Sequence, residues 1–175
     1  MERLQGFPPV VGPGATTLIL GSMPGPRSLE LKQYYGHPHN AFWGILGELV
    51  GASPQLPYPE RLRALKAARI ALWDVIASCV RDGSLDTRIC NEEPNDFETF
   101  FAQNPGIRRV FFNGSKAEQT FRRMVLGRQR LPPLHLVRLP STSPANAQVS
   151  YAQKLAAWRA IVSEPARASW PPETK

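Results

Sequence analysis

Residues 34 to 43, YYGHPHNAFW, concentrate aromatic rings and hydrogen-bonding groups in one short segment. It contains two tyrosines, two histidines, one asparagine, one phenylalanine and one tryptophan around a single glycine and a single proline. Aromatic rings stack on planar ligands, imidazoles bind metals or transfer protons, and an amide oxygen can hold a water molecule. A purely structural helix needs only an apolar stripe. This composition therefore indicates a binding or catalytic site.

The histidines and the asparagine of this segment allow several chemistries. His37 and His39 could offer two imidazoles to a metal, but no third ligand follows at a suitable spacing, and we expect no metal. Asn40 could act in chemistry, or it could cap the helix that follows it, which is a common role of asparagine. Phe42 and Trp43 lie in AFWGILGELV, which has the pattern of a helix with a buried face, so we expect both rings in the core.

Two further motifs are rich in glycine, proline and serine. GSMPGPRS, which begins at Gly21, lacks the GxxxxGK[ST] pattern of a Walker loop, and Met23 stands where a nucleophile elbow needs serine. LPSTSPANA contains Ser141 and Ser143, but the sequence pairs neither with a histidine and a carboxylate. Phosphate binding by the loop backbone is the better interpretation of this second motif.

Four short apolar runs separate these motifs and indicate the strands that position them. Stretches with helical spacing lie between the runs, so strands alternate with helices. Apolar strands separated by helices are typical of a parallel sheet covered on both faces. We predict an α/β fold, a single three-layer αβα domain with a central four-stranded, mainly parallel sheet, its strands being Thr16–Leu20, Ile70–Ile76, Val110–Phe112 and Leu134–Leu139.

Three polar pairs with capping-box spacing predict where helices begin, because each member can satisfy a free backbone N–H of the first turn. These pairs are Asn95 with Glu98, Ser115 with Glu118, and Ser150 with Gln153. The domain is expected to span 1–175, with a core over about 15–163 and a flexible tail over 164–175, where EPARASWPPETK is rich in proline.

Ligands of an open parallel sheet bind beyond the carboxyl ends of its strands. Small or polar residues stand at all four predicted ends, and two of the ends carry proline-containing turns that let a backbone approach a ligand. The residues at these ends are GSMPGP from Gly21, Asp74 within the second run, NGS from Asn113, and PSTSPAN from Pro140.

The charge of the chain indicates a polyanionic partner. The 21 Lys and Arg residues exceed the 14 Asp and Glu residues by a net charge of +7, and the sequence pI is about 9.9. Such a field concentrates phosphate backbones, so nucleic acid is the first partner to consider. The arginines at 122, 123, 128 and 130 form a cluster, but we interpret each of them as part of a solvated surface.

Other features of the composition suit a cytoplasmic protein. No run approaches the ~18 apolar residues of a membrane span, and residues 1–9 lack the pattern of a signal peptide. Two cysteines, Cys79 and Cys90, make neither a disulfide framework nor a CxxC metal pattern, and we expect reduced thiols.

Four motifs in this order resemble those of a known family. GSMPG after the first strand, YYGHPHNAFW, LWD in the second strand and LPSTSPANA after the fourth resemble the uracil-DNA glycosylase superfamily, over roughly residues 15–160. Within it the chain is most similar to the DNA-deoxyinosine (hypoxanthine-DNA) glycosylases, and HPxNxFW also resembles the mismatch-specific uracil-DNA glycosylases. The resemblance implies a monofunctional glycosylase that acts on a flipped, deaminated base in DNA and leaves an abasic site, and the base we expect is hypoxanthine. It implies no metal, no organic cofactor and a monomer.

The resemblance also implies roles for individual residues. Asn40 is the catalytic residue and holds the attacking water, since Met23 occupies the position where many relatives have Asp or Asn for this purpose. Tyr35 stacks on the extruded base, and Asp74 reads it. The alternatives are a surface or core ring for Tyr35 and a structural carboxylate for Asp74. The predicted base contacts are Gly21, Ser22, Met23, Pro24, Tyr35, Asp74 and Asn113, and the predicted DNA contacts are Lys116, Ser141, Thr142, Ser143, Ala145 and Asn146.

Two departures from the family pattern leave alternatives open. Leu139 stands where related uracil enzymes often place a His or Asn that stabilises the departing base, and Met23 cannot hold a water as Asp would. Both departures favour a module that binds a base without cleaving it. A separate alternative keeps the reaction and makes uracil, perhaps opposite guanine, the main substrate. The intact HPxN containing Asn40 argues for an enzyme.

Overall fold

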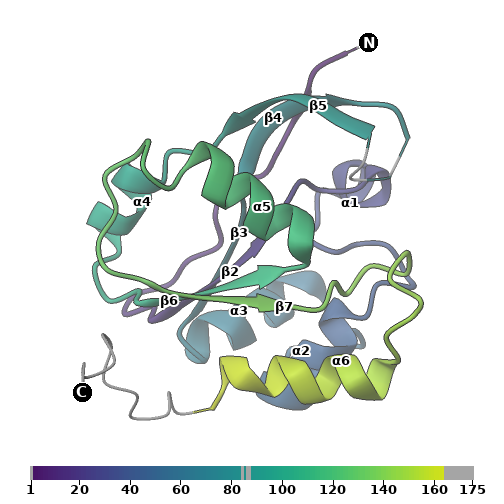
Figure 1. Cartoon of the computed structure of the whole chain (residues 1–175). Coiled ribbons are helices and arrows are strands. Elements are labelled where there is room, and N and C mark those ends of the chain that lie inside the picture. Colours follow the sequence, from purple (N-terminus) through teal and green to yellow (C-terminus); the bar gives the residue numbers. More distant parts are fainter. Residues whose placement is uncertain (1, 84, 86–87, 164–175) are drawn as a thin grey trace, which may run out of the picture.

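A computed structural model describes residues 2–83, 85 and 88–163, and its centre is a four-stranded parallel sheet (Figure 1). The strand order is β3-β2-β6-β7, and each adjacent pair runs parallel. Every residue of β2 and β3 is buried, as expected for strands covered on both faces. The prediction of the sheet is confirmed, with its strands at β2 (Thr17–Gly21), β3 (Ile70–Asp74), β6 (Arg109–Asn113) and β7 (His135–Leu139).

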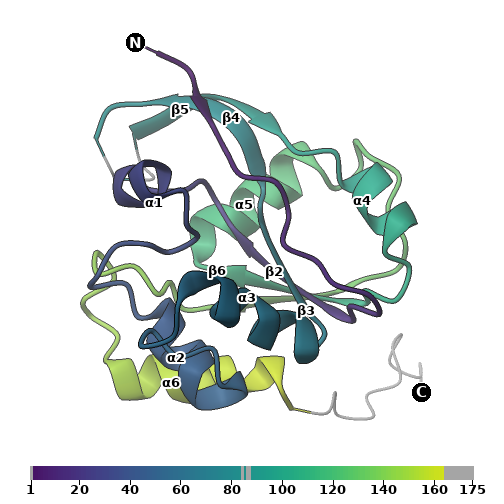
Figure 2. The same cartoon turned by 180° about the vertical axis from the view of Figure 1, so that it is seen from behind.

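Helices cover both faces of this sheet, as Figures 1 and 2 show. On one face α4 (Phe97–Gln103) and α5 (Ser115–Met124) bury a cluster that includes Leu18, Leu20 and Phe112. On the other face α2 (Phe42–Val50), α3 (Tyr58–Ala67) and α6 (Tyr151–Trp158) bury a cluster that includes Ile19 and Phe111. Successive strand residues thus alternate between two cores, and the three-layer αβα prediction is confirmed.

A second sheet was not predicted from the sequence. Its three antiparallel strands, in the order β1-β4-β5, are β1 (Leu4–Gln5), β4 (Ile76–Arg81) and β5 (Ile89–Pro94). The apolar run expected as one strand over 70–76 divides at Val75, where β3 ends and β4 begins. This sheet buries a small third cluster of Met23, Ile76, Cys79 and Ile89. Further helical elements of the described residues include α1 (Pro26–Leu31) and the 3-10 helix η2 (Arg159–Ile161).

Helices begin within two residues of all three predicted starts, but only one of the three predicted capping boxes is present. Ser150 and Gln153 form the reciprocal capping box of α6. The cap of α4 is Asp96, because the side chain of Asn95 instead donates to the backbone oxygen of Asp74 at 2.8 Å. Ser115 is the first residue of α5, whose N-cap is a glycine with a positive φ and no side-chain cap.

Both cysteines are free thiols, Cys79 buried and Cys90 exposed, as predicted. Among the described residues, no helix is both long enough and apolar enough to cross a membrane. The predicted tail, 164–175, lies outside the described residues.

Candidate active site

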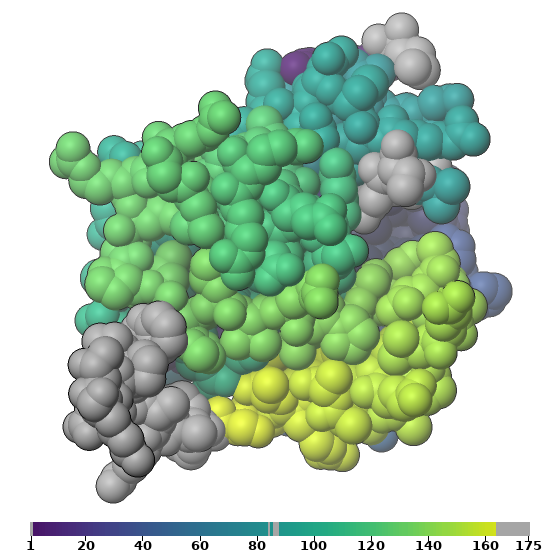
Figure 3. All heavy atoms as spheres, in the orientation of Figure 1, coloured from purple at the N-terminus to yellow at the C-terminus, as the bar shows by residue number. Residues whose placement is uncertain are grey.

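A cleft of about 890 Å³ opens at the carboxyl ends of the parallel strands. Figure 3 shows the surface hollowed between the β4–β5 hairpin and the segment that follows β7. This is the end of the sheet where the sequence predicted the site. The cleft is lined by all but one of the predicted site residues, namely Gly21, Ser22, Met23, Pro24, Tyr35, Asn40, Asp74, Asn113, Ser141, Thr142, Ser143, Ala145 and Asn146.

Asn40 lies on the cleft wall immediately before α2 and is held from two sides. Its Oδ1 accepts a hydrogen bond from the backbone N–H of Phe42 at 3.0 Å, and its own N–H donates to the backbone oxygen of His37 at 3.0 Å. The side chain of Asn40 thus satisfies the N–H of the first residue of α2 from one position before the N-cap, Ala41, and serves the helix start as the predicted cap would. An amide oxygen accepts two hydrogen bonds, so capping leaves one acceptor direction of Oδ1 for a water in the cleft.

The loop after β7 is fastened to the cleft wall through Thr142. The Asn113 Nδ2 donates to the Thr142 hydroxyl at 2.9 Å, the Thr142 N–H donates to Asn113 Oδ1 at 2.9 Å, and the Ala41 N–H donates to the Thr142 backbone oxygen at 3.0 Å. Thr142 is fully buried, so its hydroxyl cannot reach a phosphate while the loop keeps this conformation. The structure favours a positioning role for Thr142 and Asn113 over the predicted contacts with DNA and base.

The outer part of this loop presents its polar groups more openly. The Ser141 Oγ accepts the Ser143 N–H, and the Ser143 Oγ accepts the Ala145 N–H, both at 3.2 Å. A hydroxyl that accepts in this way can still donate its hydrogen to a phosphate oxygen. Asn146 donates to the Ser141 backbone oxygen at 3.1 Å, which closes the loop on itself.

Lys154 supports the same loop from below, and sequence reasoning missed it. Although it is a lysine it is 6% exposed, and its Nζ donates to the Ser143 backbone oxygen at 3.3 Å. Burial lowers the pKa of this ammonium group. Lys154 could not be identified from the sequence, because a single lysine in the helix after LPSTSPANA is too common a feature.

The floor of the cleft brings together Gly21, Asp74 and Tyr35. Gly21 and Asp74 are partners across the last step of the β2–β3 ladder. A methyl group added to Gly21 would lie 2.5 Å from Asp74 Oδ1 and 2.7 Å from the Tyr35 hydroxyl oxygen. Asp74 is 3% exposed. Tyr35 has φ +53° and stacks on Phe42, with ring centroids 4.0 Å apart.

Comparison with known proteins assigns the family. The model of the uracil DNA glycosylase superfamily matches residues 8–162. The chain belongs to the uracil DNA glycosylase superfamily.

Relatives in the superfamily include two archaeal proteins named hypoxanthine DNA glycosylase. The one from Methanosarcina barkeri is 46% identical over 116 residues, which are 66% of this chain and 73% of the relative. The one from Methanosarcina acetivorans is 37% identical over 158 residues, which are 90% of this chain and 96% of the relative. A solution NMR structure from Methanosarcina acetivorans, provisionally assigned as a uracil DNA glycosylase, has a TM-score of 0.72 at 35% identity and covers 93% of this chain and 100% of its own.

The two residues that depart from the superfamily pattern are core side chains. Met23 is 7% exposed and packs with Ile76, Cys79 and Ile89 under the β4–β5 hairpin. Leu139 is 4% exposed and packs in the core beneath α2 and α6. Both residues line the cleft, and neither side chain carries a group suited to acid–base chemistry.

Two arginines and one histidine line the cleft without having been predicted there. These are Arg27, His37 and Arg138. The Nδ1 of His37 accepts the N–H of His39 at 3.0 Å, so this pair forms a local turn. No group of three metal-ligating side chains occurs among the described residues.

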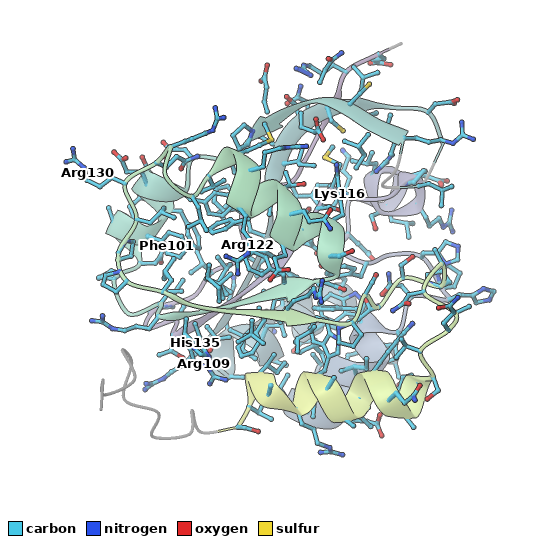
Figure 4. All side chains as sticks on the ribbon, viewed as in Figure 1. Phe101, Arg109, Lys116, Arg122, Arg130 and His135 are labelled. Carbon is cyan, nitrogen blue, oxygen red and sulfur yellow. The ribbon has the colours of Figure 1, made fainter. Side chains whose placement is uncertain are left out.

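Lys116 is the predicted site residue that does not line the cleft. Its Nζ donates to Glu92 Oε1 at 3.0 Å, on the side of α5 that faces β5 (Figure 4). Burial would raise the pKa of Glu92, but the hydrogen bonds to its carboxylate and the charges of Lys116 and Arg123 together outweigh burial and hold the pKa below its usual range. The arginines at 122, 123, 128 and 130 are exposed, as predicted, and lie outside the cleft lining.

The amino ends of the parallel strands carry cationic and titratable side chains that lie away from the cleft. Figure 4 shows Arg109 and His135 at the amino ends of β6 and β7, away from the cleft. The Arg109 guanidinium donates to the backbone oxygens of Ala160 and Ser163, so it secures the chain after α6.

Proposed function

We propose that this chain is a DNA glycosylase that hydrolyses the N-glycosidic bond of a deaminated base, with hypoxanthine as its main substrate. The observation that carries the proposal is Asn40, which is fixed by its backbone partners on the wall of a cleft large enough for a purine nucleotide. Membership of the superfamily and the names of the two archaeal relatives support the same activity.

The base must leave the DNA stack before it can enter the cleft. Extrusion costs a few kcal/mol, which contacts in the pocket recover. The hydroxyls of Ser141 and Ser143 stand at the cleft margin and would hold the phosphates beside the lesion, while Ala145 and Asn146 would enter the gap left in the duplex. The net charge of +7 favours the encounter with DNA.

Asn40 would direct the attacking water rather than deprotonate it. An amide oxygen accepts a hydrogen bond but takes no full proton, so the reaction is dissociative. The C1′–N bond breaks first, its electron pair leaves with the base, and the sugar becomes an oxocarbenium ion. The oriented water then adds through its oxygen to C1′ and loses a proton, and the base is released in neutral form after protonation. Orientation and electrostatics supply the rate.

Asp74 would select the base by accepting a hydrogen bond. An ionised carboxylate can accept the N1–H of hypoxanthine, whereas the N1 of adenine presents a lone pair that it repels. The position of Asp74 at the buried floor of the cleft supports this role. The N3–H of uracil would satisfy the same acceptor, so uracil is the second candidate substrate.

The experiment measures abasic-site formation on matched duplexes that contain one deoxyinosine, one deoxyuridine or neither. We expect wild-type protein to act on deoxyinosine most rapidly and Asn40→Ala to lose about a hundredfold or more, by analogy with removal of one transition-state hydrogen bond. The variant also loses a cap, which costs about 1 kcal/mol.

Asp96→Ala is the matched control for that loss, because Asp96 caps α4 through the Thr99 N–H and lies outside the cleft lining. Activity of Asn40→Ala within tenfold of the control would refute the role of Asn40. Cleavage of deoxyuridine alone would replace hypoxanthine by uracil, and tight binding without cleavage would identify a binding module.

A further inference from the structure

The ring of Tyr35 is poorly placed to act as a simple stacking platform. One face lies against Phe42, with an interplanar angle of 25° and a centroid distance of 4.0 Å. The ring is half-buried, and its hydroxyl oxygen is buried at the cleft floor. The hydroxyl group of Tyr35 therefore points into the protein. Stacking of the ring on a base would not explain the position of this hydroxyl group.

That polar end meets the Asp74 carboxylate above Gly21. A single methyl group at Gly21 would lie 2.5 Å from Asp74 Oδ1 and 2.7 Å from the Tyr35 hydroxyl oxygen, so the two oxygens share the space that a side chain would fill. Gly21 and Asp74 are also direct partners in the parallel ladder. A phenol can donate a hydrogen bond, and an ionised carboxylate can only accept one, so the two groups are complementary.

The backbone around Tyr35 is arranged to direct its ring to this point. Tyr35 has φ +53°, a left-handed conformation that is unfavourable for a bulky side chain. Its neighbours are pinned on both sides: the Tyr34 N–H donates to the Tyr58 hydroxyl at 3.0 Å, and the Gly36 N–H donates to the Ser28 Oγ at 2.9 Å. Strain that a structure enforces in this way is typical of functional sites.

The negative charge of Asp74 also affects the pKa of the neighbouring tyrosine, Tyr34. Burial raises the pKa of Tyr34, and the negative charge of Asp74 raises it further. Tyr34 donates its hydroxyl hydrogen to the Pro8 backbone oxygen at 2.8 Å, away from the carboxylate. Of these two adjacent tyrosines, Tyr35 is thus the one whose hydroxyl meets Asp74 over Gly21.

We propose that Tyr35 is a positioning residue, which acts through its hydroxyl group to fix the Asp74 carboxylate, and that this pair decides which bases the cleft accepts. The inference rests on the proposed function. It places the function of Tyr35 in its hydroxyl group, whereas the resemblance implied that the ring face stacks on the base. A fixed carboxylate presents its acceptor in one direction, whereas a rotating one would tolerate several bases.

The test compares Tyr35→Phe, Asp74→Asn and the double variant in single-turnover base release from deoxyinosine and deoxyuridine duplexes. Tyr35→Phe keeps the ring and its contact with Phe42 and removes only the hydroxyl. We expect it to lower kcat/KM for deoxyinosine about tenfold and to change the deoxyinosine-to-deoxyuridine ratio. The double variant should lose no more activity than Asp74→Asn. Tyr151→Phe is the matched control, because Tyr151 donates to a Glu48 carboxylate outside the cleft lining.

Wild-type kinetics for Tyr35→Phe on both substrates would overturn the proposal. So would a loss of activity that is equal on both substrates and that, in the double variant, adds to the loss caused by Asp74→Asn. The same variants are unfolded in urea, which needs no activity. Non-additive shifts of the unfolding midpoint would support the pair, and additive shifts would overturn it. Absence of base release by wild-type protein would refute the proposed function, while the urea cycle would still decide whether the two side chains interact.

Discussion

Gly21→Ala tests the close packing at the cleft floor most sharply. The added methyl group would lie 2.5 Å from Asp74 Oδ1 and 2.7 Å from the Tyr35 hydroxyl oxygen. Non-bonded carbon contacts prefer about 3.5 to 4.0 Å, so both groups must retreat by roughly 1 Å. Overpacking of this kind costs about 1 to 3 kcal/mol. A displacement of about 1 Å in an active site can cost about a hundredfold in rate.

Urea unfolding and single-turnover release of base from a deoxyinosine duplex measure the two effects. Gly25→Ala is the matched glycine control in the same loop, because a methyl group there meets nothing within 4 Å. We expect Gly21→Ala to lose about a hundredfold in release and Gly25→Ala to stay within about tenfold of wild type. Equal stability and equal activity of the two variants would refute the packing argument.

Three other predictions concern the loop after β7 and the α6 surface. Thr142→Val leaves the Asn113 amide without its buried acceptor and should lower the free energy of unfolding, measured in urea, by about 1 to 3 kcal/mol. An unchanged free energy of unfolding would contradict the positioning role of Thr142. Lys154→Met removes a buried charge and its hydrogen bond to the loop, so kcat/KM should fall about tenfold while thermal stability stays the same or rises. An unchanged kcat/KM would contradict the role of Lys154 in supporting the loop. Burial and the Glu48 carboxylate raise the pKa of Tyr151 from 10.0 to about 12. The unfolded state therefore loses this proton first, and the free energy of unfolding should fall as pH rises from 10 to 12, less steeply in Tyr151→Phe.

The sequence predicted the central sheet because its strands are short apolar runs with no competing interpretation. TLIL, VFF and LHLVRL each became a buried or partly buried strand of the parallel sheet. The end of the sheet that holds the cleft followed from the same pattern, since polar residues stand at each carboxyl end. Local chemistry therefore specified both the layers and the place of the site.

Features that depend on distant contacts could not be predicted in this way. IALWDVI is apolar apart from Asp74, and nothing in its pattern shows that the chain leaves one sheet at Val75 and enters another. The cap of α4 moved to Asp96 because the Asn95 side chain bonds to a strand 21 residues earlier in the chain. Burial of Lys154 likewise depends on where the loop after β7 folds over α6.

The two residues that depart from the family pattern could be interpreted only from the structure. Met23 and Leu139 suggested a loss of catalytic groups when only their types were known. Both residues line the cleft, but their side chains are buried in two different apolar clusters, and neither offers a strong hydrogen-bond acceptor for a water. The assignment of catalysis to Asn40 thus does not compete with either residue.

The most direct test is to identify both products of one turnover. A duplex with a single deoxyinosine is incubated with excess protein, and mass spectrometry measures the free base and the abasic strand. Hydrolysis directed by Asn40 predicts free hypoxanthine and an abasic strand in equal amounts, with both products lost in Asn40→Ala. An intact deoxyinosine strand recovered from a tight complex would contradict the account.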